Sequence, residues 1–177
     1  KWEKKAYGKG FELGGKTLGI IGFGRIGQHL GVMAKAIGMK VIAFDIYQVP
    51  VISEQLGIPY VEMDELLAQS DFISVHAPAV DGGALISAEN IAKMKDGVVV
   101  INTSRGTNVD EAALLDALNS GKVRAAGLDV YADEPASNAA LYSHPMVSCT
   151  PHIGAATVEA QKRIGAEIVD IITNFKA

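Results

Sequence analysis

The stretch Thr17–Asp45 constrains the fold of this chain more than any other part of the sequence. An apolar run at 18–21 is typical of a buried strand, and a glycine-rich turn at 22–27 follows it directly. After the turn, apolar side chains recur at the spacing of one helix face: Ile26, Leu30, Met33 and Ile37. The predicted helix ends at a glycine, and a second apolar run at 41–44 leads to Asp45. This stretch therefore predicts a strand, a turn, a helix and a second strand in succession.

The glycines of the turn have the spacing G-x-G-x-x-G, and each has its own physical role. Gly22 permits a tight turn, Gly24 lets a pyrophosphate approach the backbone, and Gly27 lets the helix pack close to the strand. The helix presents unpaired N–H groups and the positive end of its dipole to the phosphates. Asp45 can accept hydrogen bonds from both ribose hydroxyls of NAD and would repel the extra phosphate of NADP. A glycine turn made for packing alone is the alternative, but the complete unit favours NAD as the cofactor.

The remainder of the chain alternates between strand and helix patterns, without the turn signal of a β-hairpin. Further strands are predicted at 59–61, 72–75, 98–101 and 123–128, and further helices at 53–57, 63–70, 87–94, 110–119 and 155–175. Residues 130–152 contain three prolines and are predicted to be irregular. Such alternation predicts an α/β fold of the Rossmann type, a doubly wound parallel sheet with helices on both faces.

Composition excludes several classes of function. The chain has 177 residues, 16 basic and 20 acidic side chains and a net charge of −4, without a basic patch that would favour nucleic acid. Cys149 is the only cysteine, so the chain forms no internal disulfide, which fits a reducing compartment. The first ten residues lack the apolar core of a signal peptide, and no apolar run reaches the ~20 residues of a membrane span. We therefore expect a soluble, cytoplasmic protein without nucleic-acid or membrane partners.

Polar side chains collect where predicted strands end, and in a parallel sheet these ends form the edge at which ligands bind. They are Asp45, His76, Thr103-Ser104-Arg105, Asp129 and His152. Arg105 can hold a substrate carboxylate by two charge-assisted hydrogen bonds. His152 can exchange the proton of a substrate hydroxyl, and Glu134 can hold the protonated imidazole. Arg105, Glu134 and His152 are therefore the candidate catalytic residues.

Each candidate also has an ordinary structural interpretation. Arg105 can be a surface ion-pair partner, Glu134 a loop carboxylate, and His152 a cap of the last helix. His76 is either a hydrogen-bonded loop histidine or part of the adenosine side of a cofactor groove. Cys149 lacks neighbours that would activate its thiolate, which favours a packed residue over a nucleophile. The spacing of histidines and cysteines predicts no metal site.

Four segments resemble the signatures of NAD-dependent D-2-hydroxyacid dehydrogenases. They are GIIGFGRIG at 19–27, INTSRG at 101–106, LDVYADEP at 128–135 and TPHIG at 150–154. These segments occur in the family's order and span nearly the whole chain. The sequence that follows, with Ala155-Ala156-Thr157 and Glu159-Ala160-Gln161, is most similar to D-3-phosphoglycerate dehydrogenases.

The resemblance implies a role for each matching residue. Arg105, Glu134 and His152 would be catalytic, and Glu134 disfavours formate as substrate, because formate dehydrogenases have glutamine there. The main chain of Arg25 and Ile26 would contact the pyrophosphate. The predicted cofactor-binding residues are Gly22, Gly24, Arg25, Ile26, Gly27, Asp45, His76, Ala77, Pro78, Thr103, Ser104, Arg105, Asp129, His152 and Gly154. Asp129 would bind the nicotinamide carboxamide, and the resemblance also implies a homodimer built through this domain.

Members of this family have a second, substrate-binding domain. In this chain only short segments lie outside the predicted NAD-binding domain. Residues 1–16 are interpreted as an interdomain hinge segment and 17–154 as the NAD-binding Rossmann domain. Residues 155–177 would form a C-terminal helix that packs on the domain and leads toward the missing substrate domain. We therefore expect an excised or truncated domain that binds NAD but turns over substrate poorly, because domain closure completes such sites.

The predicted activity is hydride transfer between C2 of a small 2-hydroxyacid and the nicotinamide. D-3-phosphoglycerate is the favoured substrate, which would place the enzyme at the first step of serine biosynthesis. One alternative is a dehydrogenase for another D-2-hydroxyacid, such as lactate or glycerate/glyoxylate. A second is an NAD(H)-sensing, corepressor-like interaction protein that keeps the same fold and the same three residues. The sequence that flanks this domain would distinguish an enzyme from a corepressor.

Overall fold

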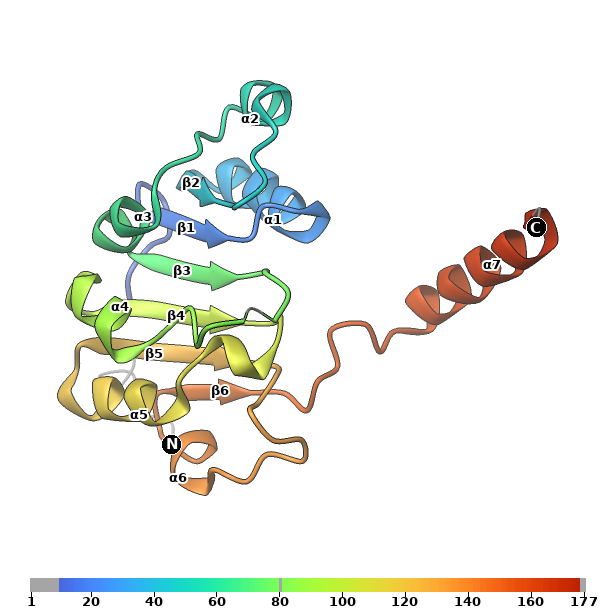
Figure 1. Ribbon diagram of the computed structural model, residues 1–177. Coiled ribbons are helices and arrows are strands. Elements are labelled where there is room, and N and C mark those ends of the chain that lie inside the picture. Colours follow the sequence, from blue (N-terminus) through green and yellow to red (C-terminus); the bar gives the residue numbers. More distant parts are fainter. Residues whose placement is uncertain (1–9, 80, 176–177) are drawn as a thin grey trace.

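A single parallel sheet forms the centre of the computed structural model, which describes residues 10–79 and 81–175 (Figure 1). Its strands lie in the order β2-β1-β3-β4-β5-β6. They are β1 (Thr17–Ile21), β2 (Lys40–Phe44), β3 (Phe72–Val75), β4 (Val98–Asn102), β5 (Val123–Leu128) and β6 (Val147–Cys149). All neighbouring pairs are parallel. The predicted α/β fold of the Rossmann type is thus confirmed.

The helices are distributed over both faces of this sheet (Figure 1). They are α1 (Arg25–Ala36), α2 (Pro50–Leu56), α3 (Met63–Gln69), α4 (Ala88–Lys93), α5 (Glu111–Ser120), α6 (Ala139–Tyr142) and α7 (Val158–Asn174), with a 3₁₀ turn, η2, at Gly106–Asn108. One buried cluster joins α3, α4 and α5 to the sheet, and a second joins α1 to β1 and β2. Two layers of helices therefore enclose the strands, which explains their nearly continuous apolar sequences.

The winding of the chain reverses at β1, which lies between β2 and β3. Tyr60 forms a single parallel bridge with Ala43 on the outer side of β2, so the strand predicted at 59–61 is reduced to one residue pair. Counting that bridge, the order is the one found in dinucleotide-binding folds. The crevice for a ligand is therefore expected beyond the carboxyl ends of β1 and β3.

Residues 130–152 are less irregular than their sequence indicates, because they contain α6 and β6. Each element is too short for a periodic pattern. The side chain of Asn138 accepts a hydrogen bond from the Leu141 amide and caps α6, while β6 has only three residues. The prediction of a wholly irregular segment was therefore wrong. By contrast, the predicted cap Ser87 is confirmed, since its Oγ accepts a hydrogen bond of 3.2 Å from the Asn90 amide.

The apolar face predicted for α1 is not the face that packs on the sheet. Gly27, Gly31 and Ala34 are buried instead, and a Cβ on Gly27 would lie 3.1 Å from Ile20 Cγ2 of β1. Only small residues allow this approach of helix to strand. Along the helix, three of the four apolar side chains are left exposed: Ile26 (69%), Met33 (61%) and Ile37 (56%). This exposed face, with the half-buried Leu30, is called the α1 apolar stripe below.

The last helix, α7, projects away from the sheet (Figure 1). None of its residues is buried, although Ile168, Ile171 and Ile172 are among its side chains. The expectation that this helix packs on the domain was therefore wrong, because its apolar side chains lie in solvent rather than against the sheet. Among the described residues, no helix is both long and apolar enough to cross a membrane.

Candidate functional site

The carboxyl ends of the strands carry the predicted site residues, and they form two neighbouring regions. The first is a cavity of about 380 Å³ whose walls come from the turns after β1, β2 and β3. The turn at 21–24 forms one wall, residues 44–47 a second, and 76–78 a third. This cavity, called the nucleotide groove below, therefore lies at the reversal point of the sheet, as the fold predicts.

Three glycines give the nucleotide groove its shape. Gly22 has a φ of +92°, and a Cβ at this position would lie 2.5 Å from the backbone nitrogen of Ala77. A Cβ on Gly27 would lie 2.4 Å from the Gly22 carbonyl oxygen. Nothing lies within 4 Å of a Cβ placed on Gly24, so the backbone there faces open space. Gly22 and Gly27 thus permit close backbone packing, while Gly24 leaves room for a ligand.

The groove offers groups that suit a dinucleotide. Gly24 caps α1 without a side-chain hydrogen bond, so the helix N-terminus can receive an anion. The Asp45 carboxylate, half-buried beside this turn, accepts hydrogen bonds from the Phe23 amide (2.7 Å) and the Tyr47 amide (2.9 Å). A carboxylate and an open helix terminus in one cavity fit a ribose and a pyrophosphate.

His76 forms part of the same groove, as the second of its two interpretations predicts. Its Nε2 lies 2.9 Å from the Ser74 hydroxyl, and its ring is half-buried. Burial lowers the pKa of His76 below its ordinary value of 6.5. The ring is therefore neutral at pH 7 and serves as a hydrogen-bonding wall rather than as a cation.

The second region lies beyond β4, β5 and β6 and contains the three candidate catalytic residues. Arg105 is exposed on the loop after β4, and its Nη1 donates a hydrogen bond of 2.7 Å to the Ser104 carbonyl. Gly106 brings this loop against the loop after β5, since a Cβ there would lie 1.7 Å from the Tyr131 carbonyl oxygen. Contact between these two backbones places Arg105 beside the loop that carries Glu134.

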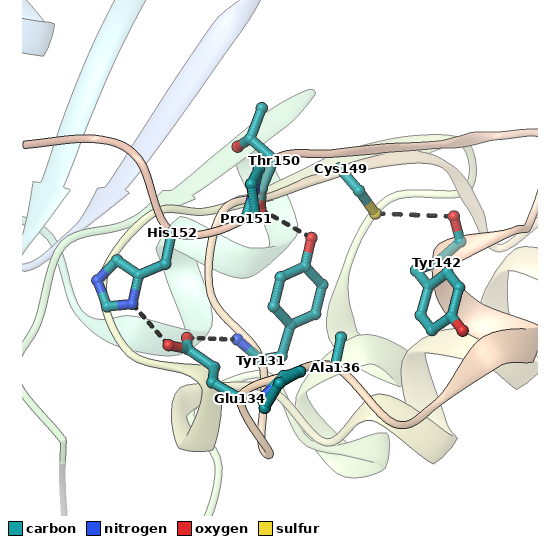
Figure 2. Close-up of a pocket in the computed structure, with 9 residues that line it drawn as sticks. Tyr131, Glu134, Ala136, Tyr142, Cys149, Thr150, Pro151 and His152 are labelled. Carbon is teal, nitrogen blue, oxygen red and sulfur yellow. Dashed lines mark hydrogen bonds and ion pairs between the residues drawn. The ribbon is translucent and has the colours of Figure 1, made fainter. Parts of the chain in front are cut away.

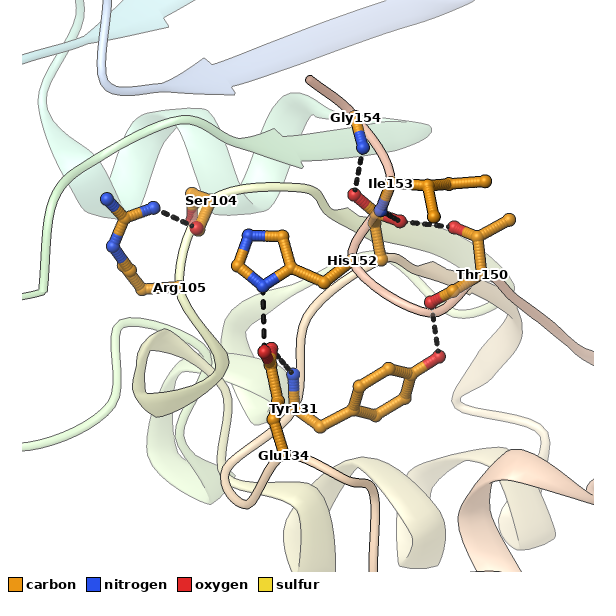
Figure 3. Close-up of polar contacts among 9 residues, drawn as sticks. Ser104, Arg105, Tyr131, Glu134, Thr150, His152, Ile153 and Gly154 are labelled. Atoms are coloured by element: carbon orange, nitrogen blue, oxygen red, sulfur yellow. Dashed lines mark hydrogen bonds and ion pairs between the residues drawn. The ribbon is translucent and has the colours of Figure 1, made fainter. Parts of the chain in front are cut away.

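Glu134 and His152 form a direct pair, with 2.8 Å between Oε2 and Nδ1 (Figure 3). Glu134 also accepts a hydrogen bond of 3.3 Å from the Tyr131 amide. The hydrogen bond with His152 lowers the pKa of Glu134, so this carboxylate is charged at neutral pH. With Nδ1 held by the carboxylate, Nε2 of His152 is the ring nitrogen left for a substrate.

Asp129 is the buried anchor of the loop that carries His152. Its carboxylate accepts hydrogen bonds from the Thr150 hydroxyl (2.6 Å), the Ile153 amide (2.9 Å) and the Gly154 amide (2.9 Å). Burial acts to raise the pKa of Asp129, but these three hydrogen bonds outweigh burial and leave the pKa below its ordinary value. His152 itself has a left-handed backbone, φ 56°, which this anchoring supports.

A cavity of about 330 Å³ adjoins the His152–Glu134 pair (Figure 2). Tyr131, Tyr142, Cys149 and Pro151 contribute to its lining. The Tyr131 hydroxyl donates a hydrogen bond of 3.0 Å to the Thr150 carbonyl, which holds the Tyr131 ring in place. In Figure 2 this ring lies between the His152–Glu134 pair and Cys149. Cys149 is exposed rather than packed, because β6 is the edge strand of the sheet.

The structure therefore places the predicted residues in two groups. Asp45, His76 and the glycines surround the nucleotide groove, whereas Arg105, Asp129, Glu134 and His152 lie around the loops after β4 to β6. Sequence reasoning missed two buried asparagines, Asn102 and Asn108, that join these groups by hydrogen bonds. No sequence motif marks them, since their role depends on contacts between loops. Among the described residues, no group of three His, Cys, Asp or Glu side chains is placed to hold a metal.

A family model described as the NAD-binding domain of D-isomer specific 2-hydroxyacid dehydrogenases matches residues 1–154. The chain belongs to this family. A hydroxypyruvate reductase of Thermotoga maritima is 52% identical over 177 residues, which cover 97% of this chain and 56% of that protein. A D-3-phosphoglycerate dehydrogenase of Mycobacterium leprae is 46% identical over 172 residues, which cover 97% of this chain and 32% of that protein. This domain thus spans between a third and a little over half of these relatives.

Solved structures of D-2-hydroxyacid dehydrogenases share the fold. A glyoxylate reductase from Paecilomyes thermophila has a TM-score of 0.88 at 41% identity, covering 94% of this chain and 52% of that one. A D-lactate dehydrogenase from Aquifex aeolicus, described as complexed with NAD and lactic acid, has a TM-score of 0.86 at 35% identity, covering 97% and 56%. NAD is therefore the cofactor of this domain, in agreement with the predicted cofactor and with the groups that line the nucleotide groove.

Proposed function

We propose that this chain is the cofactor-binding domain of an NAD-dependent D-2-hydroxyacid dehydrogenase. The observation that carries the proposal is the His152–Glu134 pair at 2.8 Å, because Glu134 lies on a loop in backbone contact with the loop of Arg105. When bound, NAD accepts the hydride from C2 of the substrate. Arg105 holds the substrate carboxylate, and His152 Nε2 takes the hydroxyl proton. Glu134 stabilises the imidazolium that results, and in the reverse direction the same proton returns from His152 to the oxygen.

The cofactor contacts follow the same division of residues. We assign the pyrophosphate to Gly22, Gly24 and Gly27 with the main chain of Arg25 and Ile26, and the adenosine ribose to Asp45. His76, Ala77 and Pro78 then form the far wall of the groove. At the nicotinamide end the assigned residues are Thr103, Ser104, Arg105, Asp129, His152 and Gly154. The assignment of Asp129 to the nicotinamide end is supported by its place beside His152, since its carboxylate accepts hydrogen bonds from the two residues that follow His152.

The proposed substrate is a three-carbon D-2-hydroxyacid, either D-3-phosphoglycerate or D-glycerate. D-3-phosphoglycerate was the sequence-based expectation and would place the enzyme at the first step of serine biosynthesis. The 52% identity to a hydroxypyruvate reductase supports D-glycerate, whose oxidation gives hydroxypyruvate, as the second candidate. We further propose that a second domain, reached through residues 1–16 and 155–177, supplies the rest of the substrate site. A cytoplasmic location remains a prediction from the sequence.

The deciding experiment measures NAD reduction by the longer protein that contains this chain. D-3-phosphoglycerate, D-glycerate and D-lactate are tested in parallel, with a His152→Ala variant beside each. We expect turnover of D-3-phosphoglycerate or D-glycerate, with a loss of ~100-fold in the variant, since proton transfer contributes that much to catalysis. Tight NADH binding without turnover of any acid would instead support the corepressor-like reading. The 177-residue chain alone is expected to bind NADH and to show little turnover.

A further inference from the structure

Asn108 is completely buried, yet it does not belong to the hydrophobic core. It ends the η2 turn, three residues after Arg105. Its Nδ2 donates hydrogen bonds to the carbonyls of Ala77 (3.0 Å) and Pro78 (3.2 Å), about thirty positions earlier in the chain. Ala77 and Pro78 form the wall of the nucleotide groove that follows β3. One buried amide thus connects the loop of Arg105 to the groove.

The main chain of Asn108 holds the other end of the same segment. The Ile86 amide donates to the Asn108 carbonyl at 2.9 Å, and Ile86 forms a parallel bridge with Val109. The segment that begins at Ala77 and ends at Ile86 is therefore attached at both ends to Asn108. Since its first residues line the nucleotide groove, the position of this wall depends on Asn108.

Hydrogen bonds continue from Asn108 to Arg105. Asn108 Nδ2 also donates to the Ser104 Oγ at 3.1 Å, and that hydroxyl donates to Asn102 Oδ1 at 2.8 Å. Asn102 Nδ2 in turn donates to the Arg105 carbonyl at 2.8 Å. Asn102, Ser104 and Asn108 are all buried, so this path runs beneath the loop and away from water. It begins at the groove wall and ends on the residue proposed to hold the substrate.

The side chain of Asn108 also carries a cost. Its Oδ1 is buried and has no hydrogen-bond partner among the described residues. An unpaired buried acceptor destabilises a fold, so an apolar side chain of similar size would serve packing better. Such a replacement would remove the hydrogen bonds that Nδ2 donates to the two loops. This combination indicates a residue suited to placing two loops rather than to filling space.

We infer that Asn108 is a positioning residue that holds the Ala77–Pro78 wall and the Arg105 loop as one unit. The groove wall that NADH contacts and the loop whose guanidinium receives the substrate carboxylate are therefore positioned together. The NADH part of this inference concerns the groove alone, whereas the substrate part rests on the proposed function.

Binding of NADH to the 177-residue chain, measured by fluorescence titration, tests the first part. Asn108→Leu keeps the bulk and removes the donors, and we expect its Kd for NADH to rise about tenfold, the effect of one or two lost hydrogen bonds. Asn108→Asp keeps the shape but turns a carboxylate oxygen toward two carbonyls, so it should weaken binding at least as much. Ser70→Ala, a buried polar change near the amino end of the sheet, should leave the Kd unchanged.

Three outcomes overturn the inference. One is a folded Asn108→Leu or Asn108→Asp chain that binds NADH as the unsubstituted chain does, even with a lower Tm. Another is an Asn108 side-chain amide that exchanges rapidly with water in NMR spectra of the unsubstituted chain, a measurement that needs no variant. In the longer enzyme we expect Asn108→Leu to raise KM for the 2-hydroxyacid several-fold, and to have no such effect once Arg105→Ala is present. The third contradicting outcome is a KM that Asn108→Leu leaves unchanged, or raises equally with and without Arg105→Ala. Failure of the unsubstituted chain to bind NADH would contradict the proposed function instead.

Discussion

Three carboxylates of this domain, those of Asp45, Glu134 and Asp129, differ in their burial and in their hydrogen-bond partners. Asp45 is half-buried in the nucleotide groove and already accepts two backbone hydrogen bonds, so its carboxylate is fixed before a ribose arrives. Glu134 and His152 are exposed and hold one another. Asp129 is buried, and it anchors the backbone from which His152 projects. We propose that Asp45 binds the ribose, that Glu134 holds the His152 ring and that Asp129 anchors its backbone, and substitutions should separate these three effects.

Asp45→Ala is expected to erode the preference for NADH over NADPH. The variant loses the acceptor for the ribose hydroxyls and the repulsion of the extra phosphate of NADPH. The Kd for NADPH divided by the Kd for NADH should therefore fall about tenfold or more. Titration of the 177-residue chain with each cofactor measures the ratio. Asp64→Ala, which removes an exposed carboxylate on α3, is the matched control. Equal affinity of the unsubstituted chain for NADH and NADPH would contradict the assignment of Asp45.

Asp129→Asn is expected to destabilise the fold in a pH-dependent way. The pKa of Asp129 is lower in the folded chain than in the unfolded chain, so the folded state gains stability from the charged form. At pH 7 the substitution should cost on the order of 2 kcal/mol, the worth of a lost charge-assisted hydrogen bond. The difference between the two chains should shrink as the pH falls below about 4, where the carboxyl takes up its proton. Urea unfolding of both chains at pH 7 and below about pH 4 measures this difference in unfolding free energy. A difference that does not change with pH would count against the anchoring role.

At the scale of elements, the strands and the polar residues at their ends were predictable, because apolar runs, glycine spacing and motif residues are local signals. The contacts between loops were not. Asn102 and Asn108 act through partners far along the chain, and α6 and β6 are too short to show a period. The packing face of α1 was misjudged for a related reason, since Gly27, Gly31 and Ala34 carry little apolar surface and yet allow the closest approach.

Gly106→Ala tests how the loops after β4 and β5 depend on one another. The new methyl group would lie 1.7 Å from the Tyr131 carbonyl oxygen, so the two backbones must separate. We expect a loss of roughly 2 kcal/mol or more in unfolding free energy. In the longer enzyme, kcat/KM should fall, because the loop that carries Arg105 and the loop that carries Glu134 are forced apart. Gly14→Ala, at a position with open space around its Cβ, is the control, and unchanged kcat/KM in Gly106→Ala would refute the dependence.

The molecule as a whole leaves two apolar surfaces uncovered. Residues of the α1 apolar stripe share a hollow with His76 of the nucleotide groove. Exposed isoleucines lie on α7, the helix that projects away from the sheet (Figure 1). Surfaces of this kind mark contacts with other protein. For α7 we propose the second domain as that contact, since this chain spans only part of its relatives. For α1 we propose a second copy of the chain, which is the homodimer through this domain expected from the sequence.

Met33→Glu should dissociate that homodimer. Met33 is 61% exposed at the middle of the stripe, and pairing two copies would take its side chain out of water. A glutamate there would have to lose its hydration against apolar neighbours, so the dimer dissociation constant should rise about 100-fold or more. Val32→Glu places the same charge on another side of α1 and should leave the dimer intact. Sedimentation velocity at several concentrations separates the outcomes. A monomeric unsubstituted chain, or a dimer that tolerates Met33→Glu, would contradict the assignment of the stripe to a second copy of the chain.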